Sequence, residues 1–508
     1  MPKHVPYEHI VMVNYRGNPV DPTEKPVLGI GHYTEVDEVK FGQQLGEVLT
    51  HVDEYARVFK PGAPSVPHTS VKHEGRRVGT HVGQSLERAL ARQRAATAEA
   101  LARGEPPPDQ RWPNPRVMIF IHGGLNTQAG SVERAVKLHE PVLADGVFPL
   151  FVNWQSSLFS SYWDHLFLVR YGEEAPTLAW ISAPFVVLAD LFRAIGRSPM
   201  TLYNELDNAQ NSSSLITSDN QKRGRALALD AQDARLPVEF PEAESQTASD
   251  VATFALDIAL AVPHMVLGIL IDIGGTASWE QMRRRTDMIL ESEESYRSRS
   301  VGLPAPAAVP RLFKELRQLQ RRLHADGIEL EVDLIAHSMG CIISNLLLGA
   351  PRGEAYGPDA EGMPVFTNIV FMANADTIEN TERAVYGHLS AAGHGRTKFF
   401  SLSLNDRAEF AETTAFYLAP KGSLLVWIDR FFEATPSMNS QRGGKLLNQL
   451  FSLHRIPKEL RERVQFKSFR FKRGHPKTNP VVHGDFNDGK FWRPEYFTPR
   501  PKSPVMDR

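Results

Sequence analysis

Continuous apolar runs that stop abruptly and lead into helical patterns recur along this chain of 508 residues. Residues 116–121, RVMIFI, form one such run and residues 147–152 form the next, with helical spacing between them at 132–138. A strand, a helix and a second strand within about forty residues make a βαβ unit, which requires parallel strands. The same pattern predicts further strands at 328–336, 366–373, 398–404 and 465–471, and a helix at 310–324. The predicted fold class is α/β, with a mostly parallel central sheet flanked by helices.

The composition is that of a globular protein and argues against a nucleic-acid binder. The chain has 57 Lys and Arg against 59 Asp and Glu, a net charge of −2, and 42% of its residues are apolar. Because a balanced charge offers no attraction to phosphate, we expect no nucleic-acid partner. Cys341 is the only cysteine. It therefore excludes an intrachain disulfide and a thiolate cluster, and it fits a reducing compartment.

The sequence contains no metal-ligand spacing and no phosphate-binding Walker pattern, so we expect no metal and no cofactor. The first residues lack an apolar run of signal-peptide length, and the expected location is the cytoplasm. Two apolar segments, 177–192 and 251–273, are expected to form buried or amphipathic helices; the alternative is membrane association through peripheral contact. The second segment carries Asp257, Asp272 and Pro263, and carboxylates are unfavourable inside a membrane span.

The segment 332–340, VDLIAHSMG, carries the strongest chemical signal. A buried strand runs into a tight turn with Ser338 at its apex, and an apolar helix follows directly. Ala336 and Gly340 are small, as required where a strand and a helix pass close beside a serine in a strained conformation. The start of the helix also supplies amides that favour a developing negative charge. This pattern is typical of a nucleophilic serine; the alternative is a serine that only caps the helix.

With this strand, serine turn and helix, the chain resembles the α/β-hydrolase superfamily of serine hydrolases. The family pattern Gly-x-Ser-x-Gly reads Ala-His-Ser-Met-Gly at 336–340, with alanine in place of the first glycine. The resemblance implies an α/β-hydrolase fold and acyl transfer by a Ser-His-Asp triad through an acyl-enzyme. It also implies an oxyanion hole, the site where backbone amides bind the negatively charged oxygen of the intermediate.

Residues 122–124, His-Gly-Gly, follow the strand at 116–121, where this family carries a His-Gly loop. The resemblance implies that the amide of Gly124 or Leu125 is one oxyanion donor and that the amide of Met339 is the other. The alternative is that the glycines only form a tight turn. Asn-Trp-Gln-Ser at 153–156 resembles a Trp-Pro-Ser segment of some bacterial members. The residues expected to line the substrate pocket are His122, His337 and Trp154.

The family order along the chain is serine, acid, histidine, so both partners of the serine must come later in the sequence. Asp406 follows the strand at 398–404 and is the expected acid, with Asp376 as the alternative. His483 is the expected base because the family carries a loop histidine followed closely by an aromatic residue, and His475 is the alternative. In this mechanism the base takes the proton of the serine, and the acid orients the base.

The remaining length is expected to belong to insertions at the carboxyl side of the sheet, where the active site of an open α/β sheet lies. The predicted core is discontinuous, at 1–156 and 307–492. The predicted additions are a helical cap at 157–306 with a polar loop at about 204–250, a smaller insertion at 409–455 and a Pro-rich tail at 493–508. The expected function is a serine ester hydrolase of esterase or lipase type, acting on a small-molecule or lipid ester with an apolar acyl portion. The alternatives are a phospholipase at a membrane surface and a catalytically inactive binding module with this fold.

Overall fold

The structure of the protein is a computed structural model. It describes residues 6–23, 33–59, 112–170, 179–197, 248–289, 307–349, 362–391, 393–412, 421–433, 437–469 and 479–499, with a few short pieces between them. His475, most of the predicted polar loop at 204–250 and the last part of the predicted tail lie outside the described residues.

Seven strands form one parallel sheet in the spatial order β1-β3-β2-β7-β8-β9-β10. The strands are β1 (Ile10–Val13), β2 (Arg116–Ile121), β3 (Val147–Trp154), β7 (Glu331–His337), β8 (Phe366–Met372), β9 (Lys398–Ser403) and β10 (Val464–Ser468). The two-residue strand β6 (Val238–Glu239) adds to the outer edge of β10. The predicted α/β class with a parallel sheet is therefore confirmed.

The strand order is not the usual order of the α/β-hydrolase fold, so the finer fold assignment does not follow from the topology. At one edge of the sheet the four-residue strand β1 lies outside β3 and runs parallel to it. The chain then turns back on itself, because Val13 pairs with Pro19 in an antiparallel bridge. The short β-like run at residues 9–14 of the sequence predicts a strand at this place, and β1 confirms it.

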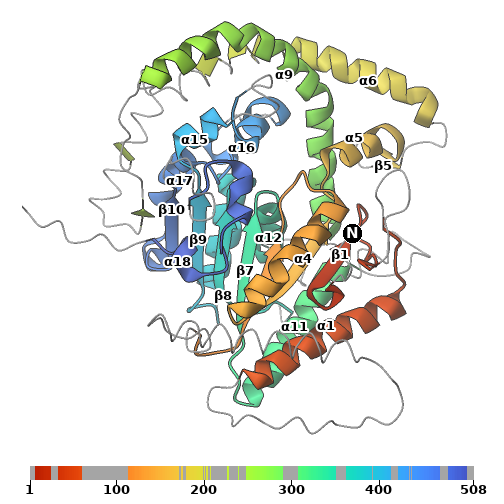
Figure 1. The fold of residues 1–508 in the computed structure, drawn as a ribbon, viewed down its shortest axis with the longest axis vertical. Helices are drawn as coiled ribbons and strands as arrows, with labels where there is room; N and C mark the ends of the chain where they lie inside the picture. The colour runs from red at the N-terminus through yellow and green to blue at the C-terminus, as the bar shows by residue number, and fades with distance from the viewer. Residues whose placement is uncertain are drawn as a thin grey trace, which may run out of the picture.

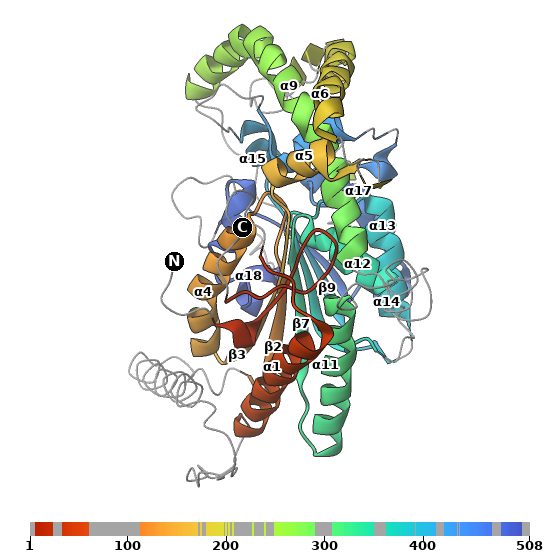
Figure 2. The ribbon, with the colours of Figure 1, turned by 90° about the vertical axis from the view of Figure 1, so that its right-hand side faces the viewer.

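Both faces of the sheet are covered, which explains the unbroken apolar runs. All six residues of β2 are buried, and they pair with β3 on one side and β7 on the other. Parallel strands covered on both faces show continuous rather than alternating apolar residues. Figure 2 shows the sheet edge-on, with α4 (Gln128–Ala144) on one face and α11 (Ala308–Ala325) and α12 (Gly340–Gly349) on the other. The helix α1 (Glu38–Val58) packs on α11.

Three helices form an arch beyond the carboxyl ends of the strands (Figure 1). They are α5 (Leu158–Phe167), α6 (Ala179–Gly196) and the long α9 (Ala248–Ile289), which contacts both of the others. Under the arch lie α15 (Asp406–Ala411), α16 (Leu424–Trp427), the π-helical turn η3 (Ile428–Phe432) and α17 (Leu446–Leu453). The two segments predicted as insertions therefore meet, because η3 packs against α9.

The predicted tail begins as part of the folded core. The short helix α18 (Pro494–Phe497) packs against β9, and its Phe497 ring lies 4.7 Å from the ring of Phe400. The buried ammonium of Lys467 donates a hydrogen bond to the carbonyl of Tyr496 at 2.7 Å. Proline at the first helical turn is compatible with this helix.

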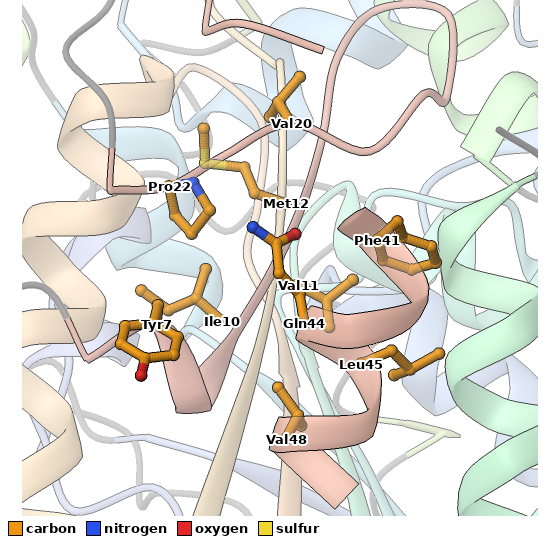
Figure 3. Close-up of a pocket in the computed structure, with 10 residues that line it drawn as sticks. All are labelled: Tyr7, Ile10, Val11, Met12, Val20, Pro22, Phe41, Gln44, Leu45 and Val48. Atoms are coloured by element: carbon orange, nitrogen blue, oxygen red, sulfur yellow. The ribbon is translucent and has the colours of Figure 1, made fainter. Parts of the chain in front are cut away.

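A small cavity lies between β1 and α1, at the edge of the sheet (Figure 3). Its lining is mostly apolar, with Ile10, Met12, Phe41 and Leu45 among the residues that face it. Its volume is about 20 Å³, little more than the space of one water molecule. It lies three strands away from β7 in the sheet. A cavity of this size and place is a packing defect rather than a substrate site.

Candidate active site

Ser338 occupies the turn between β7 and α12. Its φ angle is 53°, in the left-handed region that residues other than glycine rarely adopt. Its backbone N–H donates to the carbonyl of Met372, at the end of the neighbouring strand β8, at 2.8 Å. Its carbonyl accepts from the backbone N–H of Cys341, in the first turn of α12, at 3.0 Å. These bonds hold a strained backbone conformation, and such strain is concentrated at functional positions.

The small residues on either side of Ser338 are explained by the close approach of neighbouring strands. A Cβ atom on Gly340 would lie 2.3 Å from the carbonyl oxygen of Ile121, at the end of β2. Ala336 is fully buried in β7, between Ile121 of β2 and Phe371 of β8. A larger residue at position 340 would push the start of α12 away from the sheet. The geometry therefore requires glycine two positions after the serine.

The glycine loop after β2 packs directly on the serine turn. A Cβ atom on Gly123 would lie 2.8 Å from the Cβ of Ser338. A Cβ atom on Gly124 would lie 2.6 Å from the Sδ of Met339. The fold thus brings together two segments that are far apart in the sequence, and a side chain at position 123 would clash with the serine turn.

One of the three predicted oxyanion donors is already in use. The amide of Leu125 donates to the carbonyl of Ser156 at 2.8 Å, and the Leu125 side chain is exposed. Within the described part of the chain, the amides of Gly124 and Met339 donate no hydrogen bond. The amide of Met339 directly precedes α12 and is one of the unpaired donors of a helix start. Gly124 and Met339 are therefore the two amides that could bind an oxyanion.

His122 and Trp154 hold the glycine loop against the end of β3. The Trp154 backbone N–H donates to His122 Nε2 at 3.1 Å, and the indole N–H donates to the His122 carbonyl at 3.0 Å. His122 Nδ1 then carries the proton and donates to the carbonyl of Gly123 at 2.7 Å. Both side chains are buried, and burial lowers the pKa of His122 to about 3, so the ring is neutral at pH 7. These contacts support the loop, and the pocket-lining role of both residues stays a prediction.

The backbone of His483 is fixed from two sides. This residue begins the 3₁₀ turn η6 (His483–Asn487) and is buried. Its backbone N–H donates to Glu412 Oε2 at 2.8 Å, and its carbonyl accepts from His337 Nε2 at 3.1 Å. Asn487 Nδ2 in turn donates to His337 Nδ1 at 3.2 Å, which completes the hydrogen bonds of the His337 ring. His337, which directly precedes the serine, therefore positions the loop of His483.

The Ser338 hydroxyl and the His483 imidazole are buried and have no hydrogen-bond partner in the part of the chain that the structure describes. The His337 and His483 rings lie 5.0 Å apart. Burial lowers the pKa of His483 to about 4, so its ring is neutral at pH 7 and can accept a proton. Buried polar groups are nearly always paired, and unpaired ones point to a catalytic or binding role.

Neither predicted acid contacts the ring of His483. Asp406 begins α15 and is half-buried. Burial raises its pKa to about 6, although a hydrogen bond from the backbone of Leu447 and the charge of Lys445 both lower it. The buried carboxylate of Asp376 accepts from Asn345 Nδ2 at 2.8 Å and Asn380 Nδ2 at 2.9 Å. The hydrogen bonds of Asp376 give it a structural role beside α12, whereas Asp406 keeps capacity for another partner.

The sequence analysis missed two carboxylates near Asp406. Glu409 is buried beside Ser423, and burial raises its pKa to about 8. Burial also raises the pKa of Glu412, the residue that binds the His483 backbone, to about 7. The spacing of 406, 409 and 412 places all three on one side of a helical turn. That spacing was visible in the sequence and could have indicated a cluster.

Among the described residues no group of histidine, cysteine and carboxylate side chains could hold a metal ion. The site consists of a strained serine, a neutral buried histidine, two unused amides and carboxylates with raised pKa values. Comparison with protein-family models, with curated proteins and with solved structures gave no match.

Proposed function

We propose that the protein is a serine ester hydrolase of the α/β-hydrolase type. The observation that carries the proposal is Ser338 in the left-handed region between a buried strand and a helix, with a glycine loop packed on it. A serine in such a turn presents its hydroxyl at the carboxyl edge of the sheet, next to the amides of a helix start. A structural serine has no need of this strain.

In the proposed reaction the neutral ring of His483 removes the proton of Ser338 as the serine oxygen attacks the ester carbonyl. The amides of Gly124 and Met339 bind the oxyanion of the tetrahedral intermediate. His483 then returns the proton to the leaving alcohol, which leaves an acyl-enzyme, and water repeats the sequence to release the acid. Asp406 is the proposed acid that orients the ring.

The mechanism requires the His483 ring to turn toward both partners, since the serine oxygen and both ring nitrogens are unpaired in this structure. The backbone of His483 is already fixed by Glu412 and His337, so rotation about the side-chain bonds is the motion required. Catalytic hydrogen bonds are often loose before substrate binds and tighten in the complex. A substrate that displaces water from the site would favour the paired arrangement.

The test is labelling with a fluorophosphonate, a probe that reacts with activated serines. Wild-type protein is expected to be labelled, and Ser338→Ala is expected to lose all labelling. Ser344→Ala is the matched control, because Ser344 is buried in α12, directly after the serine turn, and donates only to the carbonyl of Gly340. Folded wild-type protein without labelling would contradict the proposal. A series of nitrophenyl esters then measures the preferred acyl length, and no preference beyond acetate would argue against an apolar acyl substrate.

A catalytically inactive binding module is the second candidate. The observation that favours it is the lack of a carboxylate on the His483 ring among the described residues. Such a module would bind an ester or acid at the oxyanion amides without turning it over. The two functions separate in the labelling experiment, because an inactive module does not react at Ser338 although its fold is intact.

A further inference from the structure

The helix α6 buries small or charged side chains and exposes large apolar ones, which is the opposite of a helix in a water-soluble protein. Its buried positions are small or charged: Ala179, Ala183, Asp190 and Ala194. Its exposed positions are large and apolar: Trp180, Ile181, Phe185, Val187, Leu188, Phe192 and Ile195. Among the described helices, α6 is the one that is long and apolar enough to cross a membrane, and only 22% of it is buried.

The inward face of α6 is held by polar contacts. Asp190 is buried and lies 3.4 Å from His165 Nε2 of α5, and it accepts a hydrogen bond from Tyr162 at 3.3 Å. Near the end of α6, Arg197 forms an ion pair with the buried Asp272 of α9 at 3.3 Å. Small residues at the other inward positions let α9 approach closely. Close packing through small residues with polar pairs between helices is typical of membrane-embedded bundles.

The exposed apolar surface continues beyond α6. The ring of Phe159 in α5 is 85% exposed, and Trp163 of the same helix is also exposed. Leu256 and Val266 of α9 are exposed as well. Figures 1 and 2 both show the arch at the end of the molecule beyond the strand ends, with α6 among its outermost parts. This apolar surface thus lies at the same end of the sheet as Ser338.

The extent of the surface favours lipid over a protein partner. At 100° per residue, the large exposed apolar side chains from Trp180 to Ile195 span about 160° of the circumference of α6. A helix packed against one partner typically buries a stripe of about 100°, so one partner helix would leave part of this surface in water, whereas lipid surrounds whatever the protein leaves open. Large apolar side chains left in water are unfavourable in proportion to the apolar area that the water contacts. Soluble monomers rarely expose contiguous apolar patches of this kind.

We propose that α6 and the exposed tip of α5 lie in the hydrocarbon layer of a lipid bilayer. The arch then orients the carboxyl end of the sheet toward the membrane surface. This inference stands without the hydrolase activity. Combined with that proposed function, on which this step rests, it assigns the substrate class: an acyl ester of a membrane lipid, which reaches Ser338 from the side of the arch.

The test is flotation of the full-length protein with vesicles of neutral phosphatidylcholine. Wild-type protein is expected to float with the vesicles, at high as well as low salt, because apolar contact does not depend on ionic strength. The double variant Phe185→Asp/Phe192→Asp is expected to lose at least tenfold in binding, since carboxylates are strongly unfavourable in hydrocarbon. Wild-type protein that stays with the soluble fraction, or a double variant that binds equally well, would overturn the proposal.

Two controls keep the result specific. Val39→Asp changes an exposed apolar residue of α1 and should bind vesicles like the wild type. Ser338→Ala should also float unchanged, so a failure of the hydrolase proposal is distinguishable from a failure of membrane binding. Circular dichroism checks that each variant is folded. A wild-type dimer that the double variant lacks, without flotation, would assign the surface to a second copy of the chain and overturn the membrane proposal.

Discussion

Two loops meet beside Ser338, and each contributes a buried histidine with a lowered pKa. In the loop after β2, both ring nitrogens of His122 are paired, one with the Trp154 backbone and one with the Gly123 carbonyl. In the loop at 479–487, both ring nitrogens of His483 lack a partner among the described residues, while its backbone N–H and carbonyl are both hydrogen-bonded. Burial lowers the pKa values of His122 and His483 to about 3 and about 4, respectively.

The rings of His122 and His483 are thus both buried, but they differ in whether their nitrogens are hydrogen-bonded. A buried histidine with satisfied nitrogens stabilises the segment that holds it, and its removal leaves orphaned backbone groups. A buried histidine with unsatisfied nitrogens is unfavourable for stability unless another molecule or another rotamer supplies the partner. The hydrogen bonds of the ring distinguish His122 from His483, although His388, on α14 (Gly387–Ser390), is also buried with both ring nitrogens unpaired among the described residues, so the place of His483 beside the serine turn is needed as well.

The largest expected effect comes from the unpaired ring. His483→Ala should reduce kcat/KM for a nitrophenyl ester by at least about 10³-fold, because no other group takes the serine proton. The free energy of unfolding should change little, since the ring makes no hydrogen bond within the described residues. His454→Ala is the matched control, because His454 is exposed at the end of α17. If His483→Ala keeps its activity, the unpaired ring is not the base, and the proposed contrast between His483 and His122 is wrong.

The paired ring should show the opposite result. His122→Ala should lower the free energy of unfolding by about 2–3 kcal/mol, because it leaves the Trp154 amide and the Gly123 carbonyl buried without partners. Urea unfolding followed by tryptophan fluorescence measures this loss. If the stability of His122→Ala equals that of the wild type, the hydrogen bonds of this ring do not support the loop.

A smaller effect is expected for Glu412, which fixes the backbone of the His483 loop. Glu412→Ala should reduce kcat by roughly 10- to 100-fold, because a lost hydrogen bond of 1–3 kcal/mol lets the base leave its position. Glu412→Gln keeps an acceptor oxygen and should retain most of the activity. Equal losses in both variants would instead indicate that the charge of Glu412 is needed, and would make it a rival to Asp406 as the acid.

The smallest effect concerns pH. Burial raises the pKa of Asp406 to about 6, so its carboxyl is charged only above that pH, whereas His483 is neutral above about pH 4. If Asp406 must be charged, kcat/KM should fall about tenfold between pH 7 and pH 5. Asp406→Asn should have a lower kcat/KM at pH 7, and its kcat/KM should no longer fall between pH 7 and pH 5. An acid limb near pH 4 in the wild type would show that the charge on Asp406 is not required.

The sequence predicted the sheet well because each central strand is covered on both faces. The run at 116–121 is β2 residue for residue, and 366–373 and 398–404 differ from β8 and β9 by one residue at the end. The serine turn was equally predictable. A side chain at position 340 would collide with the end of β2, so the glycine there indicates that a strand and a helix pass close to the serine. Local sequence thus determines what a single strand, turn or helix can do.

Contacts between distant loops were not predictable in this way. The histidine of the His-Gly-Gly segment resembled a pocket residue, and only the fold shows that its nitrogens bind Trp154 and Gly123. The sequence did not indicate Glu412, because its hydrogen bond to the His483 backbone depends on the packing of α15 against a loop far away in the chain. The apolar pattern of 177–192 predicted a helix but not its orientation, since large apolar residues are expected inside.

The only thiol of the protein lies in this same region. Cys341 is completely buried at the start of α12, and burial raises its pKa well above the usual value, so it is protonated and shielded from alkylating reagents in the folded state. Reaction with iodoacetamide therefore requires α12 to separate from the sheet. With no second cysteine to compete, the alkylation rate measures how often α12 and the serine turn open, and it needs no introduced label.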